Sequence, residues 1–227
     1  LAVADGVSQG PWSHVAAETA ARAAAKLVLE QAAQHGGVDW SLVSRRVSVR
    51  IVEEAEYRKI IGASMEDEDI NARIAQCREA MATTLVVLRI NRHSDAGGAY
   101  GAELAVLAGD SGVYRLADGR MEVAIGGKHE DDSTITSSSV RPLPGVVTPE
   151  VASLTLTDGE VLVLVSDGLG DPSGDGAGEV GKEVADRWRT PPTIDRFLLD
   201  VNFLRRSFDD DRTAVGLWLL PPTEGLG

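Results

Sequence analysis

The sequence predicts an α+β protein in which helices flank two mainly antiparallel β-sheets. Short apolar segments separated by Gly, Asn and Asp follow one another between residues 84 and 125, which is typical of consecutive strands. The helical patterns are grouped near the two ends of the chain instead. This order lacks the regular strand–helix alternation of a parallel doubly wound sheet.

The N-terminal part begins with the apolar run Leu1–Ala4, which ends at Asp5 and Gly6. After a loop, Ser13 is a plausible N-cap for a long helix with a face of small residues. The helical spacing of that face is shown by Ala16, Ala20, Ala23 and Leu27. A second helix is predicted by the spacing of Val43, Val47, Ile51 and Ala55, and the acidic run Glu66–Asp69 predicts a loop.

The middle of the chain has the pattern of four short strands, which we predict to form an antiparallel meander. They are Thr84–Ile90, Ala102–Ala108, Gly112–Leu116 and Met121–Ile125. Residues 126–149 are polar and contain Gly and Pro, so they predict a long loop of the kind that borders functional sites.

Two further strands are predicted to form a hairpin through the turn Asp158–Gly159. Val151–Thr157 alternates between apolar and polar residues, whereas Glu160–Val165 has the continuous apolar run of a buried central strand. Two helical patterns follow, and Thr213–Leu220 predicts a final strand. The helical patterns comprise Val180, Val184 and Trp188, then Ile194, Phe197, Val201 and Leu204.

The 227 residues are enough for one large domain, and we expect residues 1–222 to form it, with 223–227 as a tail. Because the chain opens directly in a strand-like run, we expect the domain to be N-terminally incomplete. The net charge of −13 argues against binding to nucleic acid or to anionic membranes. No apolar run is long enough to span a bilayer, and Cys77 is the only cysteine, so we expect a cytoplasmic protein. Arginine outnumbers lysine, a bias of GC-rich bacterial genomes.

Acidic residues follow several predicted strands at the point where each strand ends. Mg²⁺ and Mn²⁺ prefer oxygen ligands, so carboxylates that converge from different strands form a suitable site. Single signals are weak, because Asp-Gly is first of all a turn sequence, as at Asp118 and Asp158. The acidic positions are Asp5, Asp110, Asp167 with Asp171, and the run Asp209–Asp211.

Taken in order, five short motifs closely resemble the protein phosphatase 2C (PPM) family of metal-dependent Ser/Thr phosphatases. The motifs are Val3–Gly6, Met81–Leu85, Ala108–Ser111, Leu164–Asp171 and Asp210–Thr213. The resemblance extends from residue 1 to about residue 220. It implies a four-layer αββα sandwich with a binuclear Mn²⁺ or Mg²⁺ centre at one end of the sheets.

The resemblance also implies roles for individual residues. Asp5 resembles the carboxylate that bridges both metals, and Gly6 the residue whose carbonyl binds one of them. Asp167 and Asp210 resemble the remaining ligands of the other metal. Asp110 and Asp171 resemble the carboxylates that help to hold a weaker third metal in bacterial members. The implied activity is hydrolysis of phosphoserine and phosphothreonine in a phosphoprotein, the product of a Ser/Thr kinase, by a water that the metals activate. The oligomeric state and the residues that bind substrate are not defined by the sequence.

The chain also departs from the family pattern. An Arg that binds phosphate and an acidic pair should precede Asp5, and Gly112 stands where the family commonly has Arg. Arg115 and Arg141 are candidates for the phosphate contact, while His14 and His129 are more easily explained as surface residues. Trp12 could form a wall of the substrate pocket.

These departures leave two alternatives to the enzyme. The first is a phosphatase-like fold kept as a binding or regulatory module. The second is a two-metal nuclease, which would use similar carboxylates, although the acidic charge and the lack of a basic cluster beside them argue against it.

Overall fold

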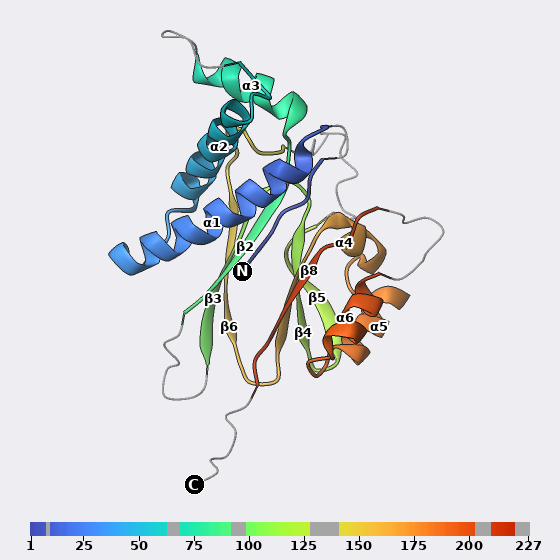
Figure 1. The fold of residues 1–227 in the computed structure, drawn as a ribbon. Helices are drawn as coiled ribbons and strands as arrows, with labels where there is room; N and C mark the ends of the chain where they lie inside the picture. Colours follow the sequence, from blue (N-terminus) through green and yellow to red (C-terminus); the bar gives the residue numbers. More distant parts are fainter. Residues whose placement is uncertain (8–9, 63–68, 92–98, 128–140, 203–209, 221–227) are drawn as a thin grey trace, which may run out of the picture.

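The computed structural model describes residues 1–7, 10–62, 69–91, 99–127, 141–202 and 210–220. It contains two antiparallel four-stranded sheets, as the sequence predicted (Figure 1). The first sheet has the order β1-β2-β3-β6, and its strands are Ala2–Val3, Leu85–Ile90, Tyr100–Ala108 and Glu150–Leu156. The second has the order β5-β4-β7-β8, and its strands are Arg120–Gly126, Gly112–Ala117, Val161–Val165 and Ala214–Trp218.

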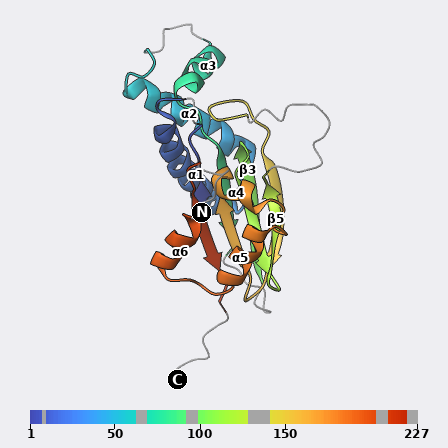
Figure 2. The same cartoon turned by 90° about the vertical axis from the view of Figure 1, so that its right-hand side faces the viewer.

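Helices cover the outer face of each sheet, which gives the layered arrangement seen from two sides in Figures 1 and 2. α1 (Ser13–His35) and α2 (Trp40–Tyr57) pack on the first sheet, and α3 (Ile70–Ala80) lies beside α2. α4 (Asp167–Ser173), α5 (Glu179–Arg187) and α6 (Ile194–Val201) belong to the second sheet. The predicted α+β class with helices outside two sheets is confirmed.

Three apolar layers hold the elements together. Between the sheets, Val86 and Leu104 of the first sheet pack with Leu162 and Leu164 of the second. A second layer joins α1 and α2 to the first sheet, and a third joins α5 and α6 to the second sheet around the fully buried Trp188. The apolar residues at every second position of β6 face the inner layer, as their alternation predicted.

The two N-terminal helices form where the sequence placed them. Ala16, Ala20 and Ala24 are 0% exposed, so α1 presents a small-residue face that allows close packing. α2 begins after Asp39, whose side chain accepts a hydrogen bond of 2.9 Å from Leu42 N–H. The predicted cap at Ser13 is wrong, because Ser13 is the first helical residue and its buried hydroxyl has no protein partner.

The sequence did not predict α3, because this helix has no apolar stripe. Arg73 and Cys77 are its buried residues. Asp69, the last residue of the predicted acidic loop, caps the helix by accepting a hydrogen bond from Asn71 N–H. Residues 63–68 lie outside the described part of the chain.

Two predicted strand pairings are wrong. Thr84–Ile125 is not one meander: β2 pairs with β3 in the first sheet, and β4 pairs with β5 in the second. β6 and β7 do not form a hairpin either, since β6 pairs with β3 and β7 lies between β4 and β8. The chain therefore crosses between the sheets at residues 109–111, between β5 and β6, and at Asp158–Gly159. A tight turn indicates that the chain reverses, but it does not say with which strand the next segment pairs.

Part of the predicted loop at residues 126–149 is described. Leu143 exchanges two backbone hydrogen bonds of 2.9 Å with Thr83, so this segment lies beside the start of β2. Residues 128–140, including His129, lie outside the described part. Of the helices in the described residues, none has the length and apolar character needed to cross a membrane.

Candidate metal centre

Asp209 lies outside the described part of the chain, and the other predicted acidic residues lie at one end of the sandwich. Asp5 follows β1, and Asp110 lies in the crossing between β3 and β4. Asp167 is the first residue of α4, directly after β7, and Asp210 precedes β8. The register places these strand ends together, because Leu85 is opposite Ala108 in the first sheet and Val165 is opposite both Gly112 and Ala214 in the second. We call Asp5, Asp110, Asp167, Asp171 and Asp210 the carboxylate end.

The carboxylates of this end repel one another. Burial raises the pKa of Asp5 from 3.8 to about 7, and the charge of Asp167, a side-chain hydrogen bond with Asp167 and the charges of Asp210 and Asp211 add to the shift. Burial also raises the pKa of Asp167, followed by the charges of Asp110, Asp210 and Asp171. Each position that the sequence selected as a carboxylate ligand therefore acts electrostatically on Asp5 or Asp167.

Glycines allow the backbone segments of this end to approach closely. A Cβ at Gly168 would lie 2.2 Å from the carbonyl oxygen of Asp211, and one at Gly6 would lie 2.7 Å from the carbonyl carbon of Ser13. Arg212 Nε donates a hydrogen bond of 3.0 Å to the carbonyl oxygen of Gly168. The turn after β7 and the segment before β8 are thus fixed against each other, which places Asp167 near Asp210.

The fold was compared with solved structures. The catalytic domain of the serine/threonine phosphatase PstP, solved with two manganese ions, matches with a TM-score of 0.56 and 21% identity over 95% of this chain and 85% of its own. The PPM phosphatase MsPP from Mycobacterium smegmatis, solved with cacodylate, matches with a TM-score of 0.52 and 20% identity over 96% and 87%. The chain has the PPM phosphatase fold. RsbX, solved with magnesium, matches with a TM-score of 0.50 and 14% identity over 95% and 78%.

Sequence comparison adds nothing to this likeness. No protein-family model matches the chain, and no curated protein does. At identities of 14–21% the likeness to solved structures concerns the fold. The likeness to the PPM fold covers the arrangement of the two sheets, whereas the roles of individual side chains are inferred from the contacts that they make in this structure.

Two threonines hold Asp5 in this PPM fold, a role that sequence reasoning missed. Thr83 and Thr84 belong to the motif Met81–Leu85, and both are buried. Thr83 Oγ1 donates a 2.8 Å hydrogen bond to the carbonyl oxygen of Asp5, and Thr84 Oγ1 accepts one of 3.1 Å from Asp5 N–H. Two adjacent Thr residues at the start of a buried strand could have indicated this role, because buried hydroxyl groups need hydrogen-bond partners.

The candidate phosphate-binding arginines have different positions. Arg115 forms an ion pair with Glu160, the residue before β7, so it lies away from the end of β7 that carries Asp167. This ion pair argues against Arg115 as the phosphate contact. Arg141 is exposed and lies two residues from Leu143, which pairs with Thr83.

The remaining candidates lie near the start of α1. His14 is exposed in its first turn, and its ring centroid is 6.2 Å from that of Trp12, which is 42% exposed.

At the start of β4, Gly112 packs tightly, since a Cβ there would lie 3.1 Å from the carbonyl oxygen of Ile125. A larger residue at position 112 would therefore crowd the backbone of β5.

The chemistry of the carboxylate end fits a hard divalent cation. Its side chains offer oxygen atoms. Burial and the charges of neighbouring aspartates raise the pKa values of Asp5 and Asp167, and a cation would offset both effects. Within the described residues, no three His, Cys, Asp or Glu side chains are already arranged as a metal site. The hydrogen bond between Asp5 and Asp167 would have to open for both carboxylates to bind an ion.

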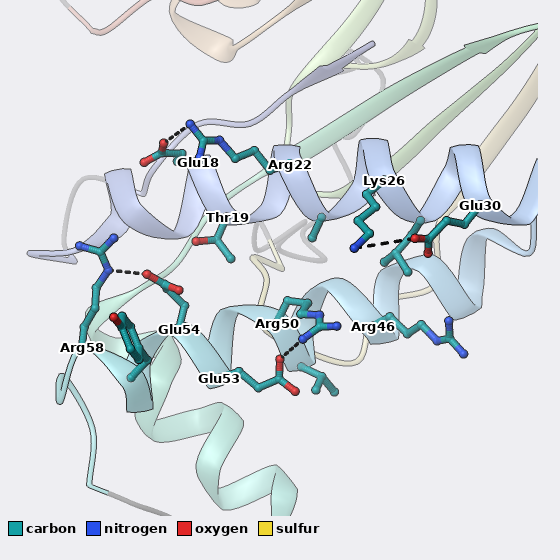
Figure 3. Close-up of a pocket in the computed structure, with 14 residues that line it drawn as sticks. Glu18, Thr19, Arg22, Lys26, Glu30, Arg46, Arg50, Glu53, Glu54 and Arg58 are labelled. Carbon is teal, nitrogen blue, oxygen red and sulfur yellow. Dashed lines mark hydrogen bonds and ion pairs between the residues drawn. The ribbon is translucent and has the colours of Figure 1, made fainter.

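A second charged region lies between the two N-terminal helices. A groove of about 870 Å³ runs along the outer faces of α1 and α2 (Figure 3). Its charged side chains form ion pairs within each helix, such as Arg22 with Glu18 at 2.7 Å and Arg50 with Glu53 at 2.6 Å. We call this region the α1–α2 groove.

Proposed function

We propose that this chain is a metal-dependent phosphoprotein phosphatase of the PP2C type that hydrolyses phosphoserine and phosphothreonine. The observation that carries the proposal is the convergence of carboxylates at one end of a PPM fold, where partial burial and the charges of neighbouring aspartates raise the pKa values of Asp5 and Asp167. Repulsion of this kind costs folding free energy unless a cation offsets it. Phosphatase chemistry uses such cations, because a phosphate dianion and an anionic nucleophile repel each other.

In this proposal, Asp5, the carbonyl group of Gly6, Asp167 and Asp210 hold two Mn²⁺ or Mg²⁺ ions, and Asp110 with Asp171 holds a third. When bound, two such ions lower the pKa of a water between them and screen the negative charge of the phosphate. The protein fixes the carboxylates on turns that are tied together by backbone hydrogen bonds. Ser166 N–H donates to Thr213 O at 3.0 Å, so the turns that carry Asp167 and Asp210 are joined on one side of the site.

The proposal includes a phosphoprotein substrate that a Ser/Thr kinase has modified, in the cytoplasm of a bacterium. The PstP likeness, a serine/threonine phosphatase fold, supports the substrate class. The net charge of −13 supports a protein substrate over nucleic acid, because phosphodiester backbones need clustered Lys and Arg.

The experiment is hydrolysis of a phosphothreonine peptide and of p-nitrophenyl phosphate with Mn²⁺. We expect Asp167→Asn to lower kcat/KM by at least about 100-fold, because it removes a charged ligand. The matched control is Asp158→Asn, an exposed aspartate at the opposite end of β7, which should keep wild-type activity. Wild-type protein that neither turns over phosphate nor binds Mn²⁺ would contradict the proposal.

A second function is supported by the raised pKa of Asp5, to which burial and then Asp167 contribute. Two carboxyl groups that share a proton do not need a cation, and a phosphatase fold in this state could serve as a binding or regulatory module. Proton sharing that persists at neutral pH in the presence of millimolar Mn²⁺, without turnover, would favour this function over the enzyme.

A further inference from the structure

The side chain of Thr84 touches both acidic turns that meet between the sheets. Thr84 is 6% exposed, and its Oγ1 accepts the hydrogen bond from Asp5 N–H at 3.1 Å. The same oxygen lies 2.8 Å from Ser111 Oγ, in the turn that contains Asp110. A hydroxyl has one proton and two lone pairs, so it can satisfy both contacts.

The methyl group of Thr84 fixes the same turn by packing. A Cβ at Gly109 would lie 2.3 Å from Thr84 Cγ2, and Gly109 has a φ of +83°. The turn therefore lies directly on the threonine side chain. On its other side, a Cβ at Gly126 would lie 2.6 Å from the carbonyl oxygen of Ser111, so the turn is enclosed between β2 and β5.

The backbone of Asp5 is held at its carbonyl group as well. Thr83 Oγ1 and Thr84 N–H each donate a hydrogen bond of 2.8 Å to Asp5 O. Because the N–H of the same residue is bound by Thr84 Oγ1, the peptide groups on both sides of Asp5 are fixed. The direction of the Asp5 side chain then depends on Thr84.

We propose that the Thr84 hydroxyl, together with Ser111, is a positioning bridge that couples Asp5 to the Asp110 turn, so that each carboxylate is held in place for the divalent cation that it binds. This inference rests on the proposed function, because it assumes that these carboxylates bind Mn²⁺ or Mg²⁺. Thr84 does not itself contact the cation. It acts as an outer partner that orients a ligand, and the loss of such partners typically weakens metal binding about 10- to 100-fold.

The test is a calorimetric titration of the metal-free chain with Mn²⁺ alone. Thr84→Val keeps the branched shape that packs on Gly109 but removes the acceptor for Asp5 N–H. We expect it to weaken Mn²⁺ affinity at least about tenfold. Thr84→Ser keeps the hydroxyl and loses the methyl group, so it should bind Mn²⁺ with nearly wild-type affinity while melting at a lower temperature.

The matched control removes another buried hydroxyl. Ser48 on α2 is 2% exposed, and its Oγ both accepts from Gly145 N–H and donates to Gly145 O at 3.1 Å. Ser48→Ala should lower the melting temperature without changing Mn²⁺ affinity. A loss of affinity in Ser48→Ala as large as in Thr84→Val would mean that general destabilisation explains the result, and the positioning role would be rejected.

The outcomes separate this inference from the proposed function. If the wild type does not bind Mn²⁺, both are rejected. If the wild type binds and Thr84→Val binds equally well, the bridge is rejected and the metal centre stands. Should Thr84→Val fail to fold, Ser111→Ala removes the other end of the bridge, and wild-type Mn²⁺ affinity in that variant overturns the proposal.

Discussion

The carboxylate end and the α1–α2 groove are both rich in charged side chains, but the carboxylate end brings like charges together, whereas the groove pairs opposite charges. At the carboxylate end, partial burial and the charges of neighbouring aspartates together raise the pKa of Asp5 to about 7. In the groove, each of several cations lies one helical turn from an anion, as Lys26 does from Glu30 at 3.8 Å. The groove is therefore neutralised by its own helices, whereas the carboxylate end is not.

This difference shows which of the two regions calls for a ligand. Exposed ion pairs within a helix contribute only about 0.3–0.5 kcal/mol each to the stability of the folded state. The groove pairs therefore add little stability, and they do not require a ligand to offset their charge. Like charges that are partly removed from water, as at the carboxylate end, destabilise the folded state until a counter-ion binds. Uncompensated charge, rather than the volume of a groove, marks the candidate site in this molecule.

The largest difference between the regions is expected when Mn²⁺ is added. A ligand that binds the folded state at about 100 times its Kd raises the free energy of unfolding by about 2.7 kcal/mol. We expect this increase in the wild type and in Arg22→Ala, a variant of the groove. Asp5→Asn should lose most of it. Thermal unfolding with and without Mn²⁺ measures the increase. Equal rises in the melting temperature of Asp5→Asn and Arg22→Ala would show that Mn²⁺ binding does not depend on Asp5.

A smaller effect is expected from crowding the backbone at the carboxylate end. Gly168→Ala places a methyl group against the carbonyl oxygen of Asp211, 2.2 Å away, so the segments that carry Asp167 and Asp210 must separate. We expect a loss of about 1–3 kcal/mol in the free energy of unfolding, together with weaker Mn²⁺ binding.

The control for this variant is Gly37→Ala, just after α1, where a Cβ meets no atom within 4 Å. Denaturant unfolding of both variants gives the comparison. A Gly168→Ala protein as stable as Gly37→Ala would show that the two segments are not held as closely as the structure places them.

The stability of the metal-free protein should depend on pH through the carboxylate end. Because the pKa of Asp5 is raised from 3.8 to about 7, the folded state binds more protons than the unfolded state within this range. The contribution of Asp5 to stability is therefore greatest below about pH 4, falls as the pH rises, and levels off above about pH 7. At pH 8, Asp5→Asn should melt at a higher temperature than the wild type, and the difference should shrink towards pH 5.

Melting temperatures of both proteins across this range test the prediction. Other titrating groups contribute to both proteins and largely cancel in the difference. A difference that does not change with pH would mean that Asp5 keeps an ordinary pKa in solution.

The smallest effect is expected in the groove. Glu18 and Arg22 form an exposed pair with side chains that are 55% and 79% exposed. A double-mutant cycle with Glu18→Ala and Arg22→Ala should give a coupling energy of about 0.3–0.5 kcal/mol or less, and Mn²⁺ affinity should not change. A coupling above about 1 kcal/mol would show that the groove charges are not simply solvated pairs.

Much of the fold could be predicted from the sequence because burial leaves a periodic pattern. The four-residue spacing of Val43, Val47 and Ile51 marks the buried face of α2, and the continuous apolar run of β7 marks a central strand. α3 was missed because it has almost no buried face. The pairing of β6 with β3 was missed because pairing depends on how the two sheets stack, which no local pattern records.

The site could be predicted in part for a different reason. Asp5, Asp167 and Asp210 were selected through a resemblance to known motifs, and the structure brings them into electrostatic contact. The positioning role of Thr84 and the pairing of Arg115 with Glu160 depend on contacts between residues far apart in the chain. Such contacts exist only after folding, so neither residue type nor spacing could show them.

The acidic turns of the carboxylate end come from both termini and the middle of the chain, and this has a kinetic consequence. Asp5 and Asp210 can meet only after both sheets have formed and stacked, because each depends on pairings with high sequence separation. We therefore expect a cation that needs all these turns to find no complete binding site in the folding transition state. Interactions absent from that state slow unfolding without accelerating folding. A bound cation would thus lengthen the lifetime of the folded protein and leave its rate of formation unchanged.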